Sequence, residues 1–162
     1  MKLHFGCGNN YMLGWVNVDI NSRIKTDKVF DFDKFPYPFK DNTFNEVYSD
    51  NVLEHLKEPV KVIEELHRIC KNGAVMMIKV PYYNCSGNYN DPTHQYSYNR
   101  RAFINLVGHG DRSDLTDKKF DLNIKLIPTR LGKLIPRFIR EYASFIIGEV
   151  YNLIEAEIVV RK

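Results

Sequence analysis

The sequence contains few cysteines. Its 162 residues include only Cys7, Cys70 and Cys85. An odd number of widely spaced cysteines argues against a disulfide framework and against a cysteine zinc site, and no metal is implied. Reduced thiols of this kind are typical of a cytoplasmic protein.

Long apolar runs are also missing. No run approaches the roughly 18 apolar residues that a membrane-spanning helix needs. The N-terminus enters a strand-like pattern at once, without the charged region and apolar segment of a secretory signal. We therefore expect a cytoplasmic protein without a transmembrane segment.

The chain has only a small excess of basic over acidic residues, which does not identify a binding partner. The net charge is +3, which is too mild to predict nucleic-acid binding without a clustered basic face. A phosphorylated or acidic substrate stays open, and nothing indicates an oligomeric state. With 44% hydrophobic residues, the chain predicts a single domain over residues 1–162.

The most informative stretch is residues 2–20, KLHFGCGNNYMLGWVNVDI. A short apolar run meets Gly6-Cys7-Gly8, and a second run ends at Asp19. Glycines at a strand end let the backbone approach a ligand, and a carboxylate closing the next strand can accept both hydroxyls of a ribose. This stretch predicts a nucleotide-type binding edge.

A dinucleotide fingerprint fits the same stretch less well. That fingerprint requires a third glycine and an acidic residue about 20 positions on. Here Asn9, Asn10 and Tyr11 follow the glycines, and Asp19 comes well before that distance. The chain also lacks a Tyr-x-x-x-Lys pair, so a Rossmann oxidoreductase or epimerase is the weaker interpretation.

The pattern downstream alternates between strands and one clear helix. Residues 28–32 and 44–49 are strand candidates, and a helix is predicted from Pro59 to Gly73. The apolar run 74–80 predicts a central strand covered on both faces.

The second half of the chain predicts a long loop, a helix and two edge strands. Residues 82–99 are polar and aromatic and leave the end of the central strand, where open α/β sheets bind ligands. A short helix is predicted over 100–107. Residues 120–126 and 154–160 alternate between apolar and polar, which predicts an antiparallel pair.

A helix after Pro136 is amphipathic. The amphipathic pattern has two interpretations. The helix contacts an anionic membrane surface, or it docks on the core, which is the interpretation we favour. Its apolar stripe consists of Ile139, Tyr142, Phe145 and Ile146, and its basic residues and approach are Arg130, Lys133, Arg137 and Arg140.

Several blocks in order resemble one family, the class I S-adenosylmethionine (SAM) dependent methyltransferases, in their type 11 methyltransferase-domain branch. Besides residues 2–20, the blocks are FDFDKFPYPFKDNTFNEVYSDNVLEHL at 30–56, ELHRICKNGAVMMIKVP at 65–81 and DPTHQYSY at 91–98. This family usually has aspartate at the position of Asn45 and histidine at that of Asn51.

The resemblance implies a three-layer, Rossmann-like α/β fold, with a mainly parallel sheet and an antiparallel strand near the C-terminal edge. The short connection between the first two strands predicts that the first crossover helix is shortened or absent. SAM is the implied cofactor. The residues implied to bind it are Gly6, Cys7, Gly8, Asp19, Ile20, Asp31, Phe32, Asp50 and Asn51.

The acceptor side is less defined. His94 and His55 are candidate catalytic bases, because imidazole titrates near neutral pH. The alternative is that His94 braces its own loop and His55 bonds the nearby backbone. The tyrosines of the loop are candidates for stacking on an acceptor or for packing a lid; they are Tyr82, Tyr83, Tyr89, Tyr96 and Tyr98.

The resemblance predicts methyl transfer to a small-molecule or glycan-type acceptor, since similar proteins are often met in polysaccharide biosynthesis. The alternative is a non-catalytic SAM-binding or interaction module. That alternative is suggested by His4, which stands where most of the family has an acidic residue, and by a chain that starts at its first strand.

Overall fold

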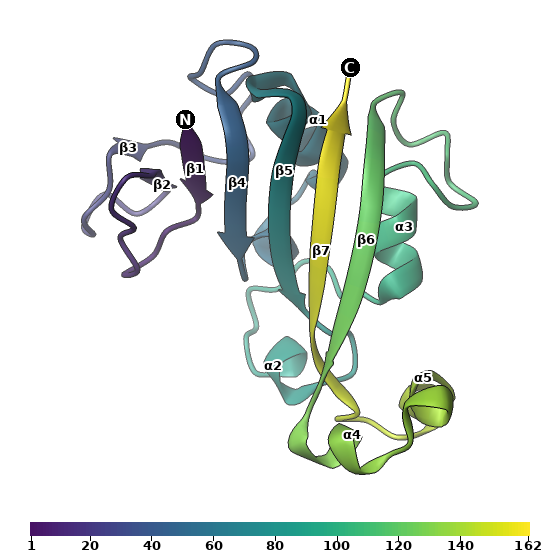
Figure 1. The fold of residues 1–162 in the computed structure, drawn as a ribbon. Helices are drawn as coiled ribbons and strands as arrows, with labels where there is room; N and C mark the ends of the chain where they lie inside the picture. The colour runs from purple at the N-terminus through teal and green to yellow at the C-terminus, as the bar shows by residue number, and fades with distance from the viewer.

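The computed structural model describes residues 1–162 as a seven-stranded sheet with helices (Figure 1). The strands lie in the order β3-β2-β1-β4-β5-β7-β6. The first five pair in parallel, and β7 runs antiparallel to both β5 and β6. Their bounds are β1 (Lys2–Phe5), β2 (Val16–Asp19), β3 (Lys28–Val29), β4 (Phe44–Asp50), β5 (Cys70–Pro81), β6 (Lys119–Pro128) and β7 (Tyr151–Arg161). The predicted fold class is therefore confirmed.

The helices follow the fourth strand. They are η1 (Leu53–His55), α1 (Pro59–Ile69), α2 (Ser86–Tyr89), α3 (Arg100–Leu106), α4 (Arg130–Leu134) and α5 (Arg137–Ile146). None of them is long and apolar enough to cross a membrane.

The connection between β1 and β2 contains no helix, as predicted. The buried amide of Asn17 holds this connection instead. Its nitrogen donates to the carbonyls of Met12 and Trp15, at 2.9 and 3.0 Å, and its oxygen accepts from the Met12 N–H at 2.8 Å. One side chain thus satisfies backbone groups that a helix would have satisfied internally.

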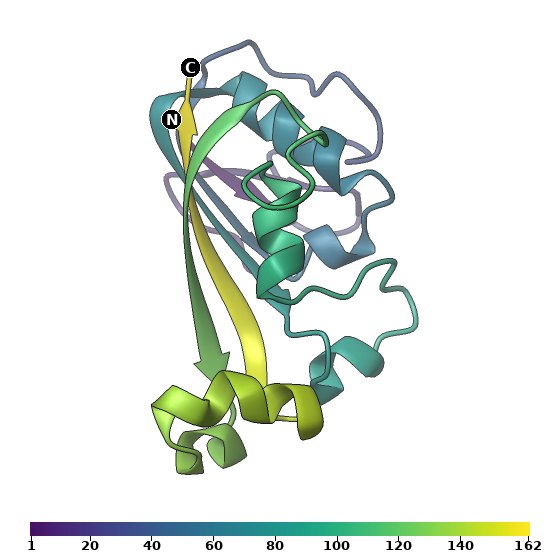
Figure 2. The ribbon, with the colours of Figure 1, turned by 90° about the vertical axis from the view of Figure 1, so that its right-hand side faces the viewer.

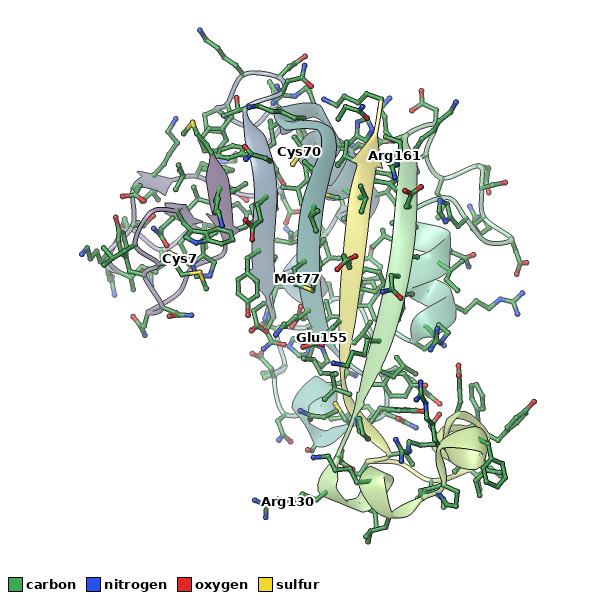
Figure 3. All side chains as sticks on the ribbon, viewed as in Figure 1. Cys7, Cys70, Met77, Arg130, Glu155 and Arg161 are labelled. Carbon is green, nitrogen blue, oxygen red and sulfur yellow. The ribbon has the colours of Figure 1, made fainter.

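The predicted second helical layer is not present over β5. Figure 2 shows α1 and α3 on one face of the sheet, with the opposite face uncovered. On β5, Met76 and Ile78 are buried under the helices, whereas Val75 is 36% exposed. Met77 points to the uncovered face, where Glu155 of β7 also lies (Figure 3). The prediction that this strand is covered on both faces is wrong, because short loops replace the early crossover helices on that side.

Two element boundaries also differ from the prediction. The helix predicted to run to Gly73 ends at Ile69, and β5 begins at once with Cys70. Gly73 instead lies inside β5 with φ +76°, where the register with β4 shifts. Such a bulge requires a residue that tolerates positive φ. β3 covers only Lys28–Val29, because the chain turns away from the sheet before residue 31.

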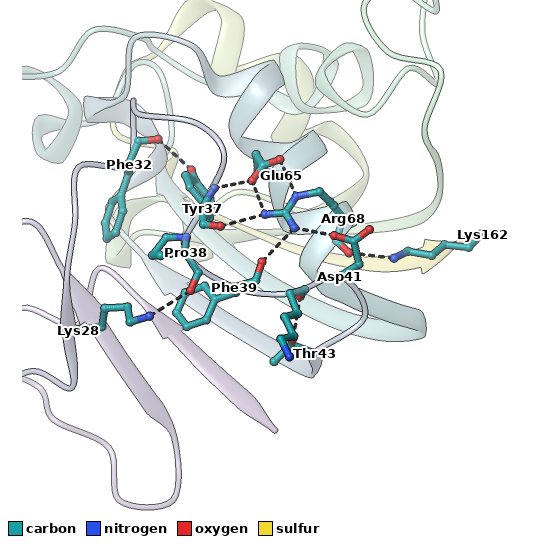
Figure 4. A network of polar contacts seen from close by, with 11 residues as sticks. Lys28, Phe32, Tyr37, Pro38, Phe39, Asp41, Thr43, Glu65, Arg68 and Lys162 are labelled. Atoms are coloured by element: carbon teal, nitrogen blue, oxygen red, sulfur yellow. Dashed lines mark hydrogen bonds and ion pairs between the residues drawn. The ribbon is translucent and has the colours of Figure 1, made fainter.

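Arg68 of α1 ties the connection between β3 and β4 to the helix (Figure 4). Its guanidinium donates to the carbonyls of Tyr37 and Phe39, at 3.1 and 3.0 Å, and to Glu65 at 2.8 Å. The hydrogen bond from Arg68 lowers the pKa of Glu65, whose carboxylate also accepts from the Tyr37 N–H. The Tyr37 hydroxyl then donates to the carbonyl of Phe32 at 2.9 Å. This network therefore positions Phe32, which is buried beside Phe5.

The α4–α5 pair lies at the end of the long strands β6 and β7 (Figures 1 and 2). Only Ser144 of α5 is buried. Phe138 is 82% exposed and Ile146 is 88% exposed. The interpretation of α5 as a helix docked on the core is therefore wrong, since amphipathicity does not identify what covers the apolar face.

Candidate active site at the carboxyl ends of the parallel strands

A cavity of about 450 Å³ opens where β1, β2 and β4 end. Pockets of this size suit a cofactor or a small ligand. Its lining residues are His4, Gly6, Cys7, Gly8, Asn10, Asp19, Ile20, Phe32, Tyr48, Asp50, Asn51, Val52, His55 and Leu56. The fold thus brings together every residue predicted to bind the cofactor except Asp31.

Gly6 and Gly8 form the wall at the end of β1. Both have positive φ, +74° and +48°. A Cβ on Gly6 would lie 2.2 Å from Cγ2 of Val52, whereas a Cβ on Gly8 would meet nothing within 4 Å. Gly6 therefore allows close packing against the segment after β4, and Gly8 leaves space above the backbone.

We expect Gly6→Ala to lower the free energy of unfolding by about 2 to 4 kcal/mol, because it adds both backbone strain and a clash. Gly8→Ala adds only the strain, and we expect a loss of about 1 kcal/mol. Urea denaturation of the two variants measures the difference. Equal losses would contradict the packing role of Gly6.

Asp19 closes β2 at the rim of the cavity. One carboxylate oxygen accepts from the Gly8 N–H at 2.8 Å, and the other accepts from the Asn21 N–H at 2.9 Å. These bonds fix the orientation of the carboxylate. Since each oxygen can accept a second hydrogen bond, the group keeps capacity for two ligand hydroxyls.

An apolar region adjoins Asp19. Ile20 is 60% exposed at the rim, and Phe32 is 4% exposed in the cavity wall. Asp31 lies outside the lining: it accepts from the Asp33 N–H and lies 3.8 Å from the Lys34 ammonium. The sequence predicted that Asp31 and Phe32 both bind the cofactor, but only Phe32 lines the cavity.

His4 lies on β1 and is 2% exposed. Its Nδ1 lies 3.1 Å from the side-chain oxygen of Asn17, which also accepts from the backbone. Because that oxygen is an acceptor, Nδ1 of His4 is the donor in this bond. The His4 ring thus lines the cavity where the family usually has an acidic residue.

The end of β4 supplies polar groups to the same cavity. Asp50 accepts from the Tyr48 hydroxyl at 2.8 Å, and Asn51 follows with φ +52°. Hydrogen bonding to Asp50 and partial burial raise the pKa of Tyr48, with burial the larger effect. The side chain of Asp50 is thereby held in the cavity lining.

A second cavity of about 310 Å³ adjoins the first, since Asn51 and His55 line both. The fold brings His55 and His94 together there, with ring centroids 4.7 Å apart. His94 lies outside the first cavity. The two predicted catalytic residues therefore share one site next to the predicted cofactor residues.

Glu54 completes this second site, and the sequence did not single it out for a role. Its carboxylate is fully buried, and Oε1 lies 4.0 Å from Nε2 of His94. Burial raises the pKa of Glu54 to about 7, with a smaller contribution from Asp50. A glutamate next to His55 in a polar cluster after a strand was the available signal.

The tyrosines of the 82–99 loop differ in exposure, and Tyr83 is half-buried with its hydroxyl on the Ser144 carbonyl. Tyr82 and Tyr98 are 1% and 4% exposed and pack in the core. Tyr89 and Tyr96 are 71% and 43% exposed. Only the second pair is placed to meet a ligand from solvent.

Comparison with known proteins agrees with this geometry. Residues 3–78 match a family described as methyltransferase domain. No curated protein matches the chain.

Solved structures of low sequence identity share the fold. A SAM-dependent methyltransferase from Archaeoglobus fulgidus is 15% identical, with a TM-score of 0.71 over 97% of this chain and 85% of its own. A possible histamine N-methyltransferase from Thermotoga maritima is 12% identical, with a TM-score of 0.63 over 99% of this chain and 82% of its own. Phosphoethanolamine N-methyltransferase 2 from Haemonchus contortus, in complex with SAM, is 13% identical, with a TM-score of 0.68 over 99% of this chain and 48% of its own.

Proposed function

Because residues 3–78 match the methyltransferase-domain family and a SAM-dependent methyltransferase shares the fold, we propose that this chain transfers the methyl group of SAM to a small-molecule or glycan-type acceptor. The observation that carries the proposal is the pair of adjoining cavities. One is lined by Gly6, Gly8 and Asp19, and the other contains two histidines whose rings lie side by side.

The residues of the first cavity fit SAM. The open space above Gly8 admits a ligand close to the backbone. Asp19 would hold the ribose hydroxyls, and the apolar surfaces of Ile20 and Phe32 suit the adenine ring. The carboxylate of Asp50 in the cavity lining is an acceptor available to the ammonium group of the amino-acid end.

The chain's own groups would align the acceptor and take its proton. When bound, SAM supplies an electrophilic methyl group on a sulfonium. His55 and His94 are the proposed proton acceptors, since hydrogen bonds at Nδ1 of each ring leave Nε2 as the nitrogen available to the acceptor. His55 lines both cavities and is therefore the closer of the two to the cofactor residues.

The acceptor class is supported by the loop around the second cavity. Exposed Tyr89 and Tyr96 offer aromatic faces for a sugar or a ring. We further propose a cytoplasmic location and a role in polysaccharide biosynthesis. The first is supported by three free, buried cysteines and the second by the family association alone.

Incubation with radiolabelled SAM and fractionated cell extract tests the proposal. We expect label to enter one small-molecule or glycan fraction. Saturable SAM binding without label in any fraction would favour a non-catalytic binding module. A thermal shift with NAD but not with SAM would favour an oxidoreductase.

We also propose that the α4–α5 pair lies on an anionic membrane surface. Apolar side chains on this pair are exposed, and four basic side chains belong to the same two helices. The apolar ones include Leu134 (81%), Phe138 (82%), Tyr142 (75%), Phe145 (63%) and Ile146 (88%), and the basic ones are Arg130, Lys133, Arg137 and Arg140. An apolar face on helices that also carry arginine and lysine matches the interior and the headgroups of an anionic bilayer surface.

We expect the chain to co-sediment with vesicles that contain phosphatidylserine, but not with pure phosphatidylcholine. The double variant Phe138→Ser and Ile146→Ser should bind at least about tenfold more weakly, because two apolar side chains no longer enter the bilayer. Leu13→Ser, at an 87% exposed position in the β1–β2 connection, is the matched control.

Two outcomes would contradict membrane binding. One is equal binding of the double variant and the parent chain to the vesicles. The other is a dimer in light scattering that the same double substitution disrupts, since that result would assign the face to a second copy of the chain.

A further inference from the structure

Glu54 has a buried carboxylate without a hydrogen-bond partner. Its side chain is 0% exposed, and neither Oε1 nor Oε2 has a partner. The backbone fixes its position, since the Glu54 carbonyl accepts from the N–H groups of Gln95 and Tyr96, at 2.7 and 3.2 Å. A buried carboxylate costs several kcal/mol unless a cation or a proton compensates it.

His94 lies beside this carboxylate, with its Nε2 4.0 Å from Oε1. Its Nδ1 lies 3.0 Å from the carbonyl oxygen of Asn88 and donates to it, which leaves Nε2 as the nitrogen on the side of Glu54. The Asn88 side chain in turn donates to the Tyr83 carbonyl and to the Ser97 hydroxyl. The ring that faces Glu54 is therefore held in one tautomer by its own loop.

His55 is held in the same tautomer by a different route. The Thr93 hydroxyl donates to Asp91 at 2.6 Å, and it therefore accepts from Nδ1 of His55 at 2.9 Å. This bond leaves Nε2 of His55 as the nitrogen available to a ligand. Hydrogen bonding of the second ring nitrogen to a polar group is the usual way in which proteins orient a histidine that binds a metal.

One ligand atom from each of Glu54, His55 and His94 lies within 4.8 Å of the other two. No hydrogen-bond donor bonds the carboxylate, and each ring has one nitrogen that its loop contacts do not use. We propose that these three side chains bind a divalent transition-metal ion of the zinc class. Two histidines and one carboxylate form a donor set that such ions use in proteins.

Three protein ligands leave a coordination position open, as in catalytic metal sites. The cavity around the three residues adjoins the proposed SAM cavity through Asn51 and His55. The open position is therefore available to an oxygen of the acceptor, whose pKa the ion would lower. With the ion bound, His55 and His94 would act as its ligands and not as the proton acceptors. This role rests on the proposed function, whereas metal binding itself does not.

Titration of the chelator-treated full chain with zinc chloride, followed by calorimetry, tests the proposal. We expect one ion per chain, and an affinity at least about tenfold weaker in Glu54→Gln and in His94→Ala. His109→Ala removes an exposed histidine elsewhere and should bind zinc as the parent chain does. Circular dichroism of each variant shows whether it is folded.

Cobalt absorption spectroscopy gives an independent reading, because Co²⁺ bands report the ligand set directly. Absence of zinc binding to the parent chain would overturn the proposal, and so would unchanged affinity in folded Glu54→Gln and His94→Ala. In that case Glu54 and His94 share a proton instead. Zinc binding together with absent SAM binding would sustain the metal site while contradicting the proposed function.

Discussion

Replacing His94 by alanine is expected to slow methyl transfer by about 10²- to 10⁴-fold, while SAM affinity stays within about twofold. The location of His94 explains why the two effects differ. His94 lies in the second cavity and makes no part of the first, so its loss affects the acceptor and leaves the cofactor site intact. Single-turnover rates with a labelled acceptor measure the first effect, and calorimetry with SAM measures the second.

His55→Ala is the companion variant. Because His55 lines both cavities, we expect it to reduce the rate and also to weaken SAM binding modestly. His109→Ala is the control. Rates near those of the parent chain in both His94→Ala and His55→Ala would rule out a role for these rings in the reaction. A rate loss that zinc chelation reproduces would assign them to the metal.

Asp19→Ala is expected to weaken SAM binding by about 1.5 to 3 kcal/mol, which corresponds to roughly 10- to 150-fold in Kd. The Asp19 carboxylate is oriented by the N–H groups of Gly8 and Asn21, and it keeps lone pairs for the ribose hydroxyls that we propose it holds. The variant loses charge-assisted hydrogen bonds to the ligand together with the brace on the glycine turn.

Asp117→Ala is the matched control for this measurement. Asp117 is exposed and pairs only with Lys118, so its loss removes the same charge without touching either cavity. We expect SAM affinity in this variant to equal that of the parent chain. Unchanged affinity in folded Asp19→Ala would remove Asp19 from the binding site.

Periodicity in the sequence predicted most of the sheet correctly. Alternation in residues 120–126 and 154–160 predicted the antiparallel pair of β6 and β7, and the short link after Gly8 predicted the missing first helix. These features are local. The alternation of apolar and polar residues along a strand and the length of a connection can be read from neighbouring residues alone.

Which faces of β5 and α5 are covered by other elements could not be predicted in the same way. The apolar run in β5 indicates a buried strand, but Val75 faces solvent because no helix lies on that side. The apolar stripe of α5 is likewise exposed. Both errors have one cause: the pattern of an element describes its own faces and contains nothing about which other element covers them.

The candidate site was predicted in part. Residues at the ends of β1 and β2 follow a motif with fixed spacing, so Gly6, Gly8 and Asp19 could be identified from sequence. The approach of His94 to Glu54 depends on a loop whose course is determined by tertiary hydrogen bonds. The role proposed for Glu54 comes from its burial, which residue order does not reveal.

A crystal structure of the chain grown with SAM tests the central claim most directly. We expect density for the cofactor in the cavity at the ends of β1, β2 and β4, with its ribose hydroxyls on Asp19 and its adenine against Phe32. Density at another site, or a cavity filled by protein side chains when SAM is present at saturating concentration, would contradict the account.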